Sequence, residues 1–306
     1  MKSQPQVTIL LALYRPVKTF LKEQLESLAN QDYDNIDILI WDDCPDEDCE
    51  KDIAVVLPQS SYTYIKCTEN LGYVKAFEHM TSLAKGDYIA FCDQDDIWEP
   101  QKISRSVNEL LAQDALLATS DRMIIDENDK VVIPSFRQHS KFPMDTWKTG
   151  EDISSNAVFT CYALGMTIVM RTDVAKMMIP FSPNTGHDKW VTMGAAAMGK
   201  VIFIEEPLQR YRRHGDNISG TFNGITSKSD YYTKRVDAAF AVAHDLIDKF
   251  PNHPQKERIL NFANARKNQK IIQLFKLRAI APQVAFFEIL LKFTPAWLFK
   301  LILNKR

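Results

Sequence analysis

The sequence predicts an α/β fold: a Rossmann-like, mostly parallel sheet flanked by helices, with a helical extension at the C-terminus. Two observations predict this fold class. Short apolar runs alternate with longer amphipathic runs over the first hundred residues, and the last fifty residues combine apolar helical segments with an excess of Lys and Arg. The 306 residues are 45% hydrophobic and 25% charged, which is typical of a globular protein and excludes a disordered chain.

The first four strands and the helices between them are predicted from the periodicity of apolar residues. Apolar runs predict strands at residues 7–14, 36–43, 61–67 and 88–96. The segment VKTFLKEQLESLANQ places four apolar side chains on one helical face, and VKAFEHMTSLAKG predicts a helix that ends at Gly86. The four side chains are Phe20, Leu21, Leu25 and Leu28. Strands that alternate with helices predict a parallel sheet, in which ligands bind beyond the carboxyl ends of the strands.

The middle of the chain predicts two more strands and one helix. LLATSDRMIID and KVIFIEE are typical of strands, and CYALGMTIVMR is an apolar segment bounded by Asp173. A helix is expected to open at Gly186, His187 and Asp188. After KVIFIEE we expect a cationic turn, and from about Thr221 a helical, increasingly basic segment. The turn would contain Arg210, Arg212, Arg213 and His214.

Polar side chains end or follow each of the first four predicted strands. Tyr14 and Arg15 end the first strand, Asp42 and Asp43 end the second, Asn70 follows the third, and three aspartates end the fourth. Those three are Asp93, Asp95 and Asp96. Since the carboxyl ends of parallel strands meet at one edge, these side chains predict a ligand site there. No glycine-rich dinucleotide fingerprint or P-loop follows the first strand, which disfavours dinucleotide redox chemistry and ATP hydrolysis.

The acidic stretch YIAFCDQDDIWEP allows two interpretations. Carboxylates near an apolar core are costly to desolvate, so a cluster of them either faces solvent or is neutralised by a cation such as a metal. The alternative is an acidic turn that caps a helix, because aspartate accepts hydrogen bonds from the amides at a helix start.

Five motifs in order resemble those of the inverting family-2 glycosyltransferases of the GT-A fold, in particular a bacterial rhamnosyltransferase-like branch. These motifs are VTILLALY, IDILIWDD, NLGYVKAFEHM, GDYIAFCDQDDIW and HDKW. The resemblance covers roughly residues 6–220. It implies a nucleotide-sugar-binding and catalytic domain at residues 1–220 and leaves residues 221–306 as a basic amphipathic helical extension.

The resemblance also implies roles for individual residues. Asp93 and Asp95 would form the D-x-D motif that holds Mg²⁺ or Mn²⁺, with His214 approaching the metal or phosphate, and Asp188 would be the catalytic base. The nucleotide sugar would be bound by Leu13, Tyr14, Arg15, Asp42, Asn70, Lys75, Gln94 and Asp95. Asp42 would contact the base and Lys75 the diphosphate. The family usually has P-T-Y-N after the first strand, whereas this chain has Ala12, Leu13, Tyr14 and Arg15.

Each role has a structural alternative. Asp188, Asp43 and Asp96 would each suit a helix cap. The cationic turn would suit a solvated surface. Trp98 and Trp190 are more typical of packing residues than of platforms for sugars, and His187 would contact the acceptor.

The five cysteines and the charge distribution indicate the compartment and the partners. The cysteines are odd in number and lack paired C-x-x-C spacing, which predicts reduced thiols, and the N-terminus shows no signal-peptide pattern. We therefore expect a cytoplasmic protein. Residues 256–306 hold eleven Lys or Arg against Glu257 and Glu288, so this tail is basic while the chain as a whole carries a net charge of −2. We expect no nucleic-acid partner.

The end of the tail, VAFFEILLKFTPAWLFKLILNKR, predicts a helix that lies in the plane of a membrane surface. Glu288, Lys292, Lys300 and Asn304 recur at multiples of four and would form a narrow polar face opposite Trp297 and other apolar side chains. Charges and Pro295 interrupt the apolar run before it could span a bilayer. The alternative is packing on the catalytic domain or on a second subunit, as in a homodimer.

The resulting hypothesis is a metal-dependent inverting glycosyltransferase, peripheral on the inner face of the cell membrane. The resemblance implies dTDP-rhamnose or a UDP-sugar as donor and a lipid-linked saccharide as acceptor, in the synthesis of a bacterial surface polysaccharide. Two alternatives remain open. One is a nucleotide-sugar-binding or scaffold protein without turnover, and the other is a nucleotidyltransferase, which also holds Mg²⁺ with acids.

Overall fold

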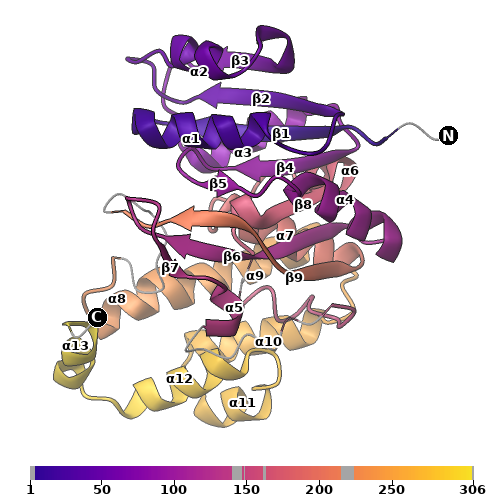
Figure 1. The fold of residues 1–306 in the computed structure, drawn as a ribbon. Coiled ribbons are helices and arrows are strands. Elements are labelled where there is room, and N and C mark those ends of the chain that lie inside the picture. Colours follow the sequence, from indigo (N-terminus) through magenta and orange to yellow (C-terminus); the bar gives the residue numbers. More distant parts are fainter. Residues whose placement is uncertain (1–3, 140–146, 148, 161–162, 215–223, 305–306) are drawn as a thin grey trace.

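The computed structural model describes residues 4–139, 147, 149–160, 163–214 and 224–304. These residues form a nine-stranded sheet with helices on both faces and a helical C-terminal part (Figure 1). The strands are β1 (Val7–Leu13), β2 (Ile36–Asp42), β3 (Tyr62–Lys66), β4 (Tyr88–Cys92), β5 (Ile97–Trp98), β6 (Leu117–Ile125), β7 (Val131–Ile133), β8 (Ile168–Arg171) and β9 (Val201–Arg212).

The strand order is β3-β2-β1-β4-β8-β6-β9-β5, and β7 pairs with β6 outside this path. Strands β1 to β4 are parallel to one another, and β6 and β9 run in the same direction. β5, β7 and β8 run the opposite way. The predicted α/β class and mostly parallel sheet are therefore confirmed. β8 inserts antiparallel between β4 and β6, which the alternation of strands and helices did not predict.

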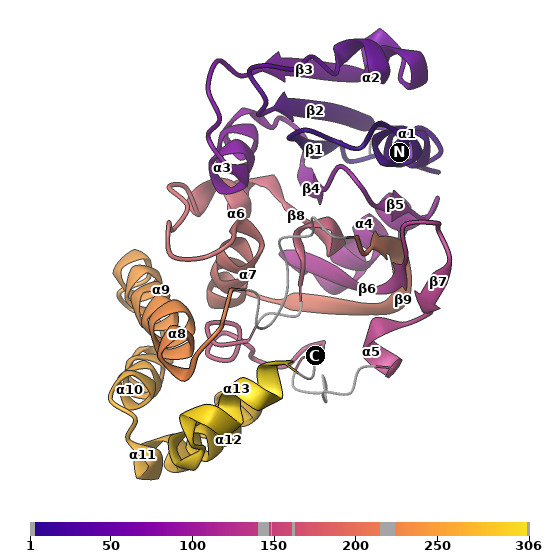
Figure 2. The same cartoon turned by 90° about the vertical axis from the view of Figure 1, so that its left-hand side faces the viewer.

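Alternating side chains of the central strand β1 enter two different cores. Leu10 belongs to a buried cluster that includes Phe77 and Met80, whereas Ile9 and Leu11 belong to a cluster on the opposite face. Successive side chains of a strand point to opposite faces, so an unbroken apolar run is what a strand covered on both sides requires. Figure 2 shows the helices that cover the two faces.

The helices of the sheet-containing part are α1 (Lys18–Ala29), α2 (Glu50–Val56), α3 (Tyr73–Leu83), α4 (Lys102–Gln113), α5 (Phe136–His139), α6 (Thr172–Met177) and α7 (His187–Met198). On α1, Leu21, Leu25 and Leu28 are buried as predicted. Phe20 is not part of that core and instead lies beside Arg212 and His214.

The predicted end of α3 at Gly86 is wrong, because the helix ends at Leu83. Gly86 has a different role. A Cβ atom at this position would stand 2.8 Å from the carbonyl oxygen of Gln6 and 2.8 Å from the amide nitrogen of Thr8. Glycine is therefore required because two backbone segments approach each other closely at the start of β4.

The predicted cationic turn after β9 is also wrong in part. Arg210 and Arg212 lie within β9, where Arg210 pairs with Ile97 of β5 and Arg212 pairs with Ile125 of β6. The strand is longer than KVIFIEE because these neighbours supply hydrogen-bond partners that local sequence does not reveal. Arg213 and His214 follow the strand, and residues 215–223 lie outside the described part of the chain.

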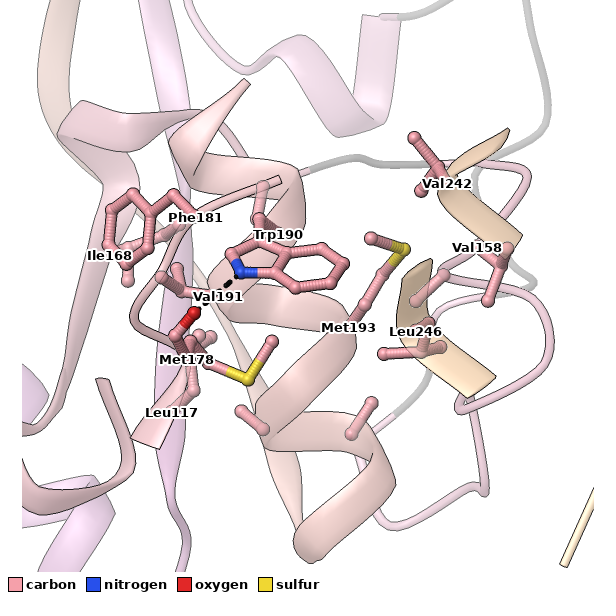
Figure 3. Close-up of a cluster of buried hydrophobic side chains, with 14 of the residues drawn as sticks. Leu117, Val158, Ile168, Met178, Phe181, Trp190, Val191, Met193, Val242 and Leu246 are labelled. Carbon is pink, nitrogen blue, oxygen red and sulfur yellow. Dashed lines mark hydrogen bonds between the residues drawn. The ribbon is translucent and has the colours of Figure 1, made fainter. Parts of the chain in front are cut away.

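The C-terminal part consists of α8 (Lys228–Tyr231), a π-helical turn (Tyr232–Val236), α9 (Asp237–Lys249), α10 (Lys256–Lys267), α11 (Ile271–Lys276), α12 (Pro282–Phe293) and α13 (Ala296–Asn304). Its first helices share a buried cluster with α7. Figure 3 shows Val242 and Leu246 of α9 close to Met193 and Val158, with the Trp190 indole donating a hydrogen bond of 2.8 Å to the Met178 carbonyl.

A buried ion pair joins three of the C-terminal helices. The Arg266 guanidinium of α10 donates to Glu288 Oε1 of α12 at 2.7 Å, and the Tyr231 hydroxyl of α8 donates to the same oxygen at 2.9 Å. The predicted polar face of the tail is therefore wrong at Glu288, which points inward and is 3% exposed, whereas Lys292 and Lys300 are exposed. The sequence periodicity missed this because the partner of Glu288 comes from another helix.

In the part of the chain that the structure describes, no helix combines the length and the apolar character needed to cross a bilayer.

Candidate active site

The sheet brings the predicted polar side chains to one edge. β1 lies between β2 and β4, with Leu13 opposite Asp42 and Leu11 opposite Cys92. The residues after β2 and β4 therefore emerge at the same edge of the sheet, on either side of β1, as the parallel arrangement predicted. Asp42 ends β2, and the aspartates of the D-Q-D-D stretch follow β4 directly.

The three aspartates after β4 occupy different environments. Burial, together with the charges of Asp95 and Asp188, raises the pKa of Asp93 to about 7. Burial and the charges of Asp95 and Asp93 raise the pKa of Asp96 well above its ordinary value, and its Oδ2 atom is buried without a described hydrogen-bond partner. Asp95 Oδ2 lies 2.8 Å from Nε2 of His214. The cluster therefore concentrates negative charge that the fold compensates only partly.

Asp188 lies in the first turn of α7, facing this cluster. The N-cap of α7 is Gly186, so Asp188 is not the helix cap. Its Oδ1 atom accepts a hydrogen bond of 2.7 Å from the amide of Lys189. A negative charge is favourable at the start of a helix, because the free amides of the first turn point toward it. The Asp188 carboxylate contributes to the raised pKa of Asp93, which brings the two predicted roles into one site.

Tyr73 is a neighbour of the predicted base that the sequence analysis did not single out. It begins α3 and is 46% exposed, and burial together with the charges of Asp188 and Asp93 raises the pKa of its hydroxyl. A Cβ atom at Gly186 would stand 2.6 Å from Asp188 Oδ1 and 3.7 Å from the Tyr73 hydroxyl. Tyr73 therefore lies beside the predicted base. Its position directly after the third strand's loop was the feature that could have revealed it.

His187 packs beneath Asp188 in an aromatic environment. Its ring stacks on Phe77 at 4.0 Å between centroids and lies 4.9 Å from the ring of Phe91. Burial lowers the pKa of His187 from 6.5 to about 4, and neither ring nitrogen has a described hydrogen-bond partner. Gly165 leaves room for the ring, since a Cβ there would stand 2.7 Å from its Nε2 atom. His187 thus supports the start of α7 rather than facing solvent.

Tyr14 and Arg15 lie exposed at the end of β1, next to the acidic turn. Gln94 holds Tyr14 from both sides: its Oε1 accepts from the Tyr14 amide at 2.8 Å, and its Nε2 donates to the Tyr14 carbonyl at 3.1 Å. Arg15 adopts a left-handed backbone conformation with φ of 44°, and its guanidinium lies 5.4 Å from the Tyr14 ring. The structure therefore joins these three predicted donor-binding residues.

Asp42 is fully buried, and its carboxylate is occupied by protein groups. Oδ2 accepts from the Tyr64 hydroxyl at 2.6 Å and from Lys66 Nζ at 3.3 Å, and Oδ1 accepts from the Cys44 amide at 3.1 Å. Asp43 instead accepts from the amides of Leu71 and Gly72, just before α3. The direct contact between Asp42 and a nucleotide base stays a prediction.

The remaining predicted donor-binding residues are dispersed. The Leu13 side chain is buried in the core, and its carbonyl oxygen accepts from the Asp43 amide at 2.8 Å. Asn70 is exposed and donates to the Asp43 carbonyl at 3.1 Å. Lys75 is exposed on α3 and forms an ion pair of 2.8 Å with Glu78. Leu13 could therefore offer a ligand only its backbone, whereas Asn70 and Lys75 remain accessible.

The residues at the end of β4 fit a divalent cation that shares its ligands with a phosphate group. Within the described ranges, no cluster of three or more His, Cys, Asp or Glu side chains is arranged to enclose a metal by itself. Mg²⁺ is commonly held by one or two carboxylates together with substrate phosphates. Asp95 and His214 are adjacent, and Asp93 lies nearby with its pKa raised by burial and by the charges of Asp95 and Asp188, which matches that requirement.

Trp98 and Trp190 are each 2% exposed, which confirms the packing interpretation for both. A further residue that the sequence analysis missed is Lys102. It is fully buried, donates to the Met166 carbonyl and to Gln209 Oε1, and lies 4.6 Å from the Trp98 ring. Burial lowers its pKa to about 7. No sequence pattern marks a lysine in an amphipathic helix as buried.

Comparison with known proteins gives one family match and several relatives. The model of the family described as Glycosyl transferase family 2 matches residues 8–168, more than half of the chain. An uncharacterized glycosyltransferase of Nostoc sp. is 26% identical over 254 residues, covering 80% of this chain and 75% of that protein. WfaP of Escherichia coli, a UDP-Glc:α-D-GlcNAc-diphosphoundecaprenol β-1,3-glucosyltransferase, is 28% identical over 189 residues, covering 61% of this chain and 69% of WfaP.

Solved structures share the fold. TarS of S. aureus (residues 1–349, in complex with UDP-GlcNAc) superposes with a TM-score of 0.63 at 17% identity, covering 91% of this chain and 82% of the TarS chain. The mannosyltransferase PcManGT of Pyrobaculum calidifontis, in complex with GDP-Man and Mn²⁺, gives a TM-score of 0.58 at 16% identity, covering 98% of this chain and 84% of that chain. The predicted GT-A fold is confirmed by this likeness.

The buried His187 predicts a pH dependence of stability. Because its folded pKa is lowered to about 4, the unfolded chain binds a proton between about pH 6.5 and pH 4 that the folded chain does not bind. Stability contributed by neutral His187 is therefore complete above pH 6.5 and is lost as the pH falls through this window. Between about pH 8 and pH 5, the wild type should lose about 2 kcal/mol more unfolding free energy than His187→Leu, measured by urea denaturation.

The matched control is His139→Leu at an exposed histidine, which should keep the wild-type loss. Equal losses in the wild type and His187→Leu would contradict the assignment of a buried neutral imidazole.

Proposed function

The chain belongs to glycosyl transferase family 2, and from this we propose that it is a metal-dependent inverting enzyme of bacterial surface polysaccharide synthesis. It transfers a sugar from a nucleotide-diphosphate sugar to a lipid-linked saccharide. The donor is dTDP-rhamnose or a UDP-hexose. The relatives that support this proposal include WfaP, whose name specifies UDP-Glc as donor and a diphosphoundecaprenol-linked acceptor.

The proposal rests on two sets of carboxylates that come from separate elements and lie in one place. Asp93 and Asp95 follow a strand at the centre of the sheet, and Asp188 starts a helix on the sheet's face, yet Asp95 and Asp188 both act on the pKa of Asp93. Sugar transfer needs one group that neutralises a departing diphosphate and another that removes a proton from the incoming hydroxyl. The two groups of carboxylates supply these two functions.

Asp95, His214 and Asp93 would hold Mg²⁺ or Mn²⁺ against the donor's diphosphate. When bound, the cation supplies charge neutralisation for the leaving nucleoside diphosphate. PcManGT, whose solved structure contains Mn²⁺ with GDP-Man, supports this choice of cofactor. Lys75 is accessible on α3 and would add a positive charge toward the diphosphate.

Asp188 acts as the general base in this proposal. Since its Oδ1 atom accepts the Lys189 amide, Oδ2 is the oxygen assigned to the acceptor hydroxyl. The positive end of α7 favours the carboxylate form that a base requires. A single displacement at the anomeric carbon inverts its configuration, by the reasoning that applies to inverting hydrolases. Tyr73, beside Asp188, lies where a sugar hydroxyl would be held.

The nucleotide would lie over the carboxyl ends of β1 and β2. Tyr14 is 47% exposed and offers its ring for stacking, and Arg15 and Asn70 are also exposed. Asp42 contributes to base recognition either directly, after its bonds to Tyr64 and Lys66 rearrange, or by orienting these two side chains.

The C-terminal helices are proposed to attach the enzyme peripherally to the inner face of the cell membrane. Phe286, Leu290 and Phe293 recur at helical spacing on α12 and are 48%, 69% and 72% exposed. Trp297 and Leu301 continue the apolar surface on α13. Residues 256–306 carry eleven Lys or Arg and two Glu, and Lys292 and Lys300 are exposed beside the apolar side chains. Apolar side chains flanked by lysines are typical of helices that lie on anionic lipid.

Donor binding predicts stabilisation by nucleotide and metal together. UDP or dTDP compounds should raise the melting temperature in the presence of Mn²⁺, because a ligand at 100 times its Kd stabilises the folded state by about 2.7 kcal/mol. Asp95→Asn should abolish the Mn²⁺-dependent part of the shift, and Asp173→Asn, which changes an exposed aspartate on α6, should not. An unchanged melting temperature with both classes of nucleotide would contradict the donor site.

The assignment of the base predicts that Asp188→Asn separates turnover from binding. Removing the base should lower kcat by about 10²- to 10⁴-fold, since general-base catalysis contributes that much, while binding of UDP and Mn²⁺ is retained. Sugar transfer is measured with a labelled donor, and binding by calorimetry. If Asp188→Asn transferred sugar at the wild-type rate, the assignment of Asp188 as the base would be contradicted. Release of pyrophosphate from a nucleoside triphosphate would indicate a nucleotidyltransferase instead.

Membrane attachment predicts that charged substitutions in the apolar surface weaken binding to vesicles. Leu290→Glu should lower partitioning onto phosphatidylglycerol vesicles about tenfold or more, because burying a leucine side chain contributes about 1.5–3 kcal/mol. Co-sedimentation measures the effect, and Val55→Glu, at an 81% exposed position on α2, is the control. If the wild type did not bind vesicles, and if it formed a dimer that Leu290→Glu converted to a monomer, the surface would be assigned to a second subunit.

A further inference from the structure

Arg212 connects β9 to three other segments, which are the acidic turn after β4, helix α1 and the turn between β6 and β7. It ends β9, two residues before His214, and its side chain is 1% exposed. We propose that Arg212 is a positioning residue that fixes Asp95 and His214 for metal binding. This inference rests on the proposed function, because it requires that the acidic turn receives a divalent cation.

Arg212 holds the acidic turn through two separate hydrogen bonds. Its Nε atom donates to the backbone carbonyl of Asp95 at 2.9 Å, and its backbone amide donates to Asp96 Oδ1 at 3.0 Å. The first bond fixes the main chain from which the Asp95 side chain projects. The second fixes the neighbouring carboxylate, so that the turn cannot rotate without breaking both bonds.

The guanidinium is itself held by two carboxylates from distant parts of the chain. Nη2 donates to Glu23 of α1 at 2.6 Å, and Nη1 donates to Asp129 in the turn between β6 and β7. The planar guanidinium can bond all of these partners at once, because it presents several N–H donors in fixed directions. A lysine ammonium could keep the charge but could not reach the Asp95 carbonyl and both carboxylates in the same geometry.

An aromatic ring extends the arrangement to the second expected ligand. The Arg212 guanidinium lies 4.3 Å from the centroid of the Phe20 ring, and the same ring lies 5.6 Å from the imidazole of His214. His214 in turn lies 2.8 Å from Asp95 Oδ2. Phe20 and Arg212 therefore contact both expected ligands, the ring through His214 and the guanidinium through the main chain of Asp95. Groups that orient metal ligands in this way commonly change metal affinity about 10- to 100-fold when they are replaced.

The experiment compares Mn²⁺ binding with folding stability in matched arginine variants. Free Mn²⁺ is measured by electron paramagnetic resonance during titration of the full chain in the presence of UDP or dTDP. Arg212→Lys should raise the apparent Kd for Mn²⁺ about 10- to 100-fold. The control is Arg266→Lys, which changes another buried arginine, paired with Glu288 away from the site. It should lower the melting temperature but leave the Mn²⁺ affinity unchanged.

Two further variants keep the inference testable if Arg212→Lys fails to fold. Glu23→Gln removes one outer partner and Phe20→Leu removes the ring contact, and each should raise the Kd for Mn²⁺ severalfold. Unchanged Mn²⁺ affinity in all folded variants, with a wild type that binds Mn²⁺, would overturn the role of Arg212 and leave the proposed function intact. A wild type that binds no Mn²⁺ with either nucleotide would overturn the metal site itself, and with it this inference.

Discussion

Repulsion among the carboxylates at the end of β4 is the constraint on which the site depends. Three aspartates stand within four residues, directly after a strand buried on both faces, and Asp188 approaches from α7. Water cannot screen such charges well, so the pKa values of Asp93 and Asp96 rise. The fold places Arg212 beneath the turn and Lys102 nearby, which limits the repulsion without removing it. A cation bound at the turn would neutralise the remaining negative charge of the carboxylates.

The two cores of the sheet explain how the chain tolerates this arrangement. β1 and β4 are covered on both faces, so apolar packing fixes the strands that lead to the aspartates, while Arg212 holds the turn itself. His187, stacked on Phe77 and Phe91, extends the same packing to the start of α7. Apolar packing therefore holds both elements that lead to the predicted site aspartates, β4 and α7.

The sequence predicted what depends on local periodicity and missed what depends on distant partners. The first four strands, the helix α1 and the gathering of acids at one edge follow from apolar runs and from parallel connectivity, and the structure contains all of them. Arg210 and Arg212 were expected in a turn. They lie in a strand instead, because they pair with residues of β5 and β6 that are distant in the sequence and that local periodicity does not reveal. Glu288 was expected in water for the same reason, since its partner Arg266 belongs to another helix. Tyr73 had no signature beyond its place after a strand.

The antiparallel strand β8 separates the molecule into two parts of different construction. On one side, β1 to β4 carry most of the residues that the proposed function assigns to the donor. On the other side lie β6, β9 and β5, and the match to the family model crosses β8 in the sheet, because it includes β5 and β6 and ends at residue 168, before Asp188 and the C-terminal helices. The two sides meet where Arg212 and His214, at the end of β9, contact Asp95 after β4. An alteration at the end of β9 would therefore reach the acidic turn, although the two segments belong to opposite sides of β8.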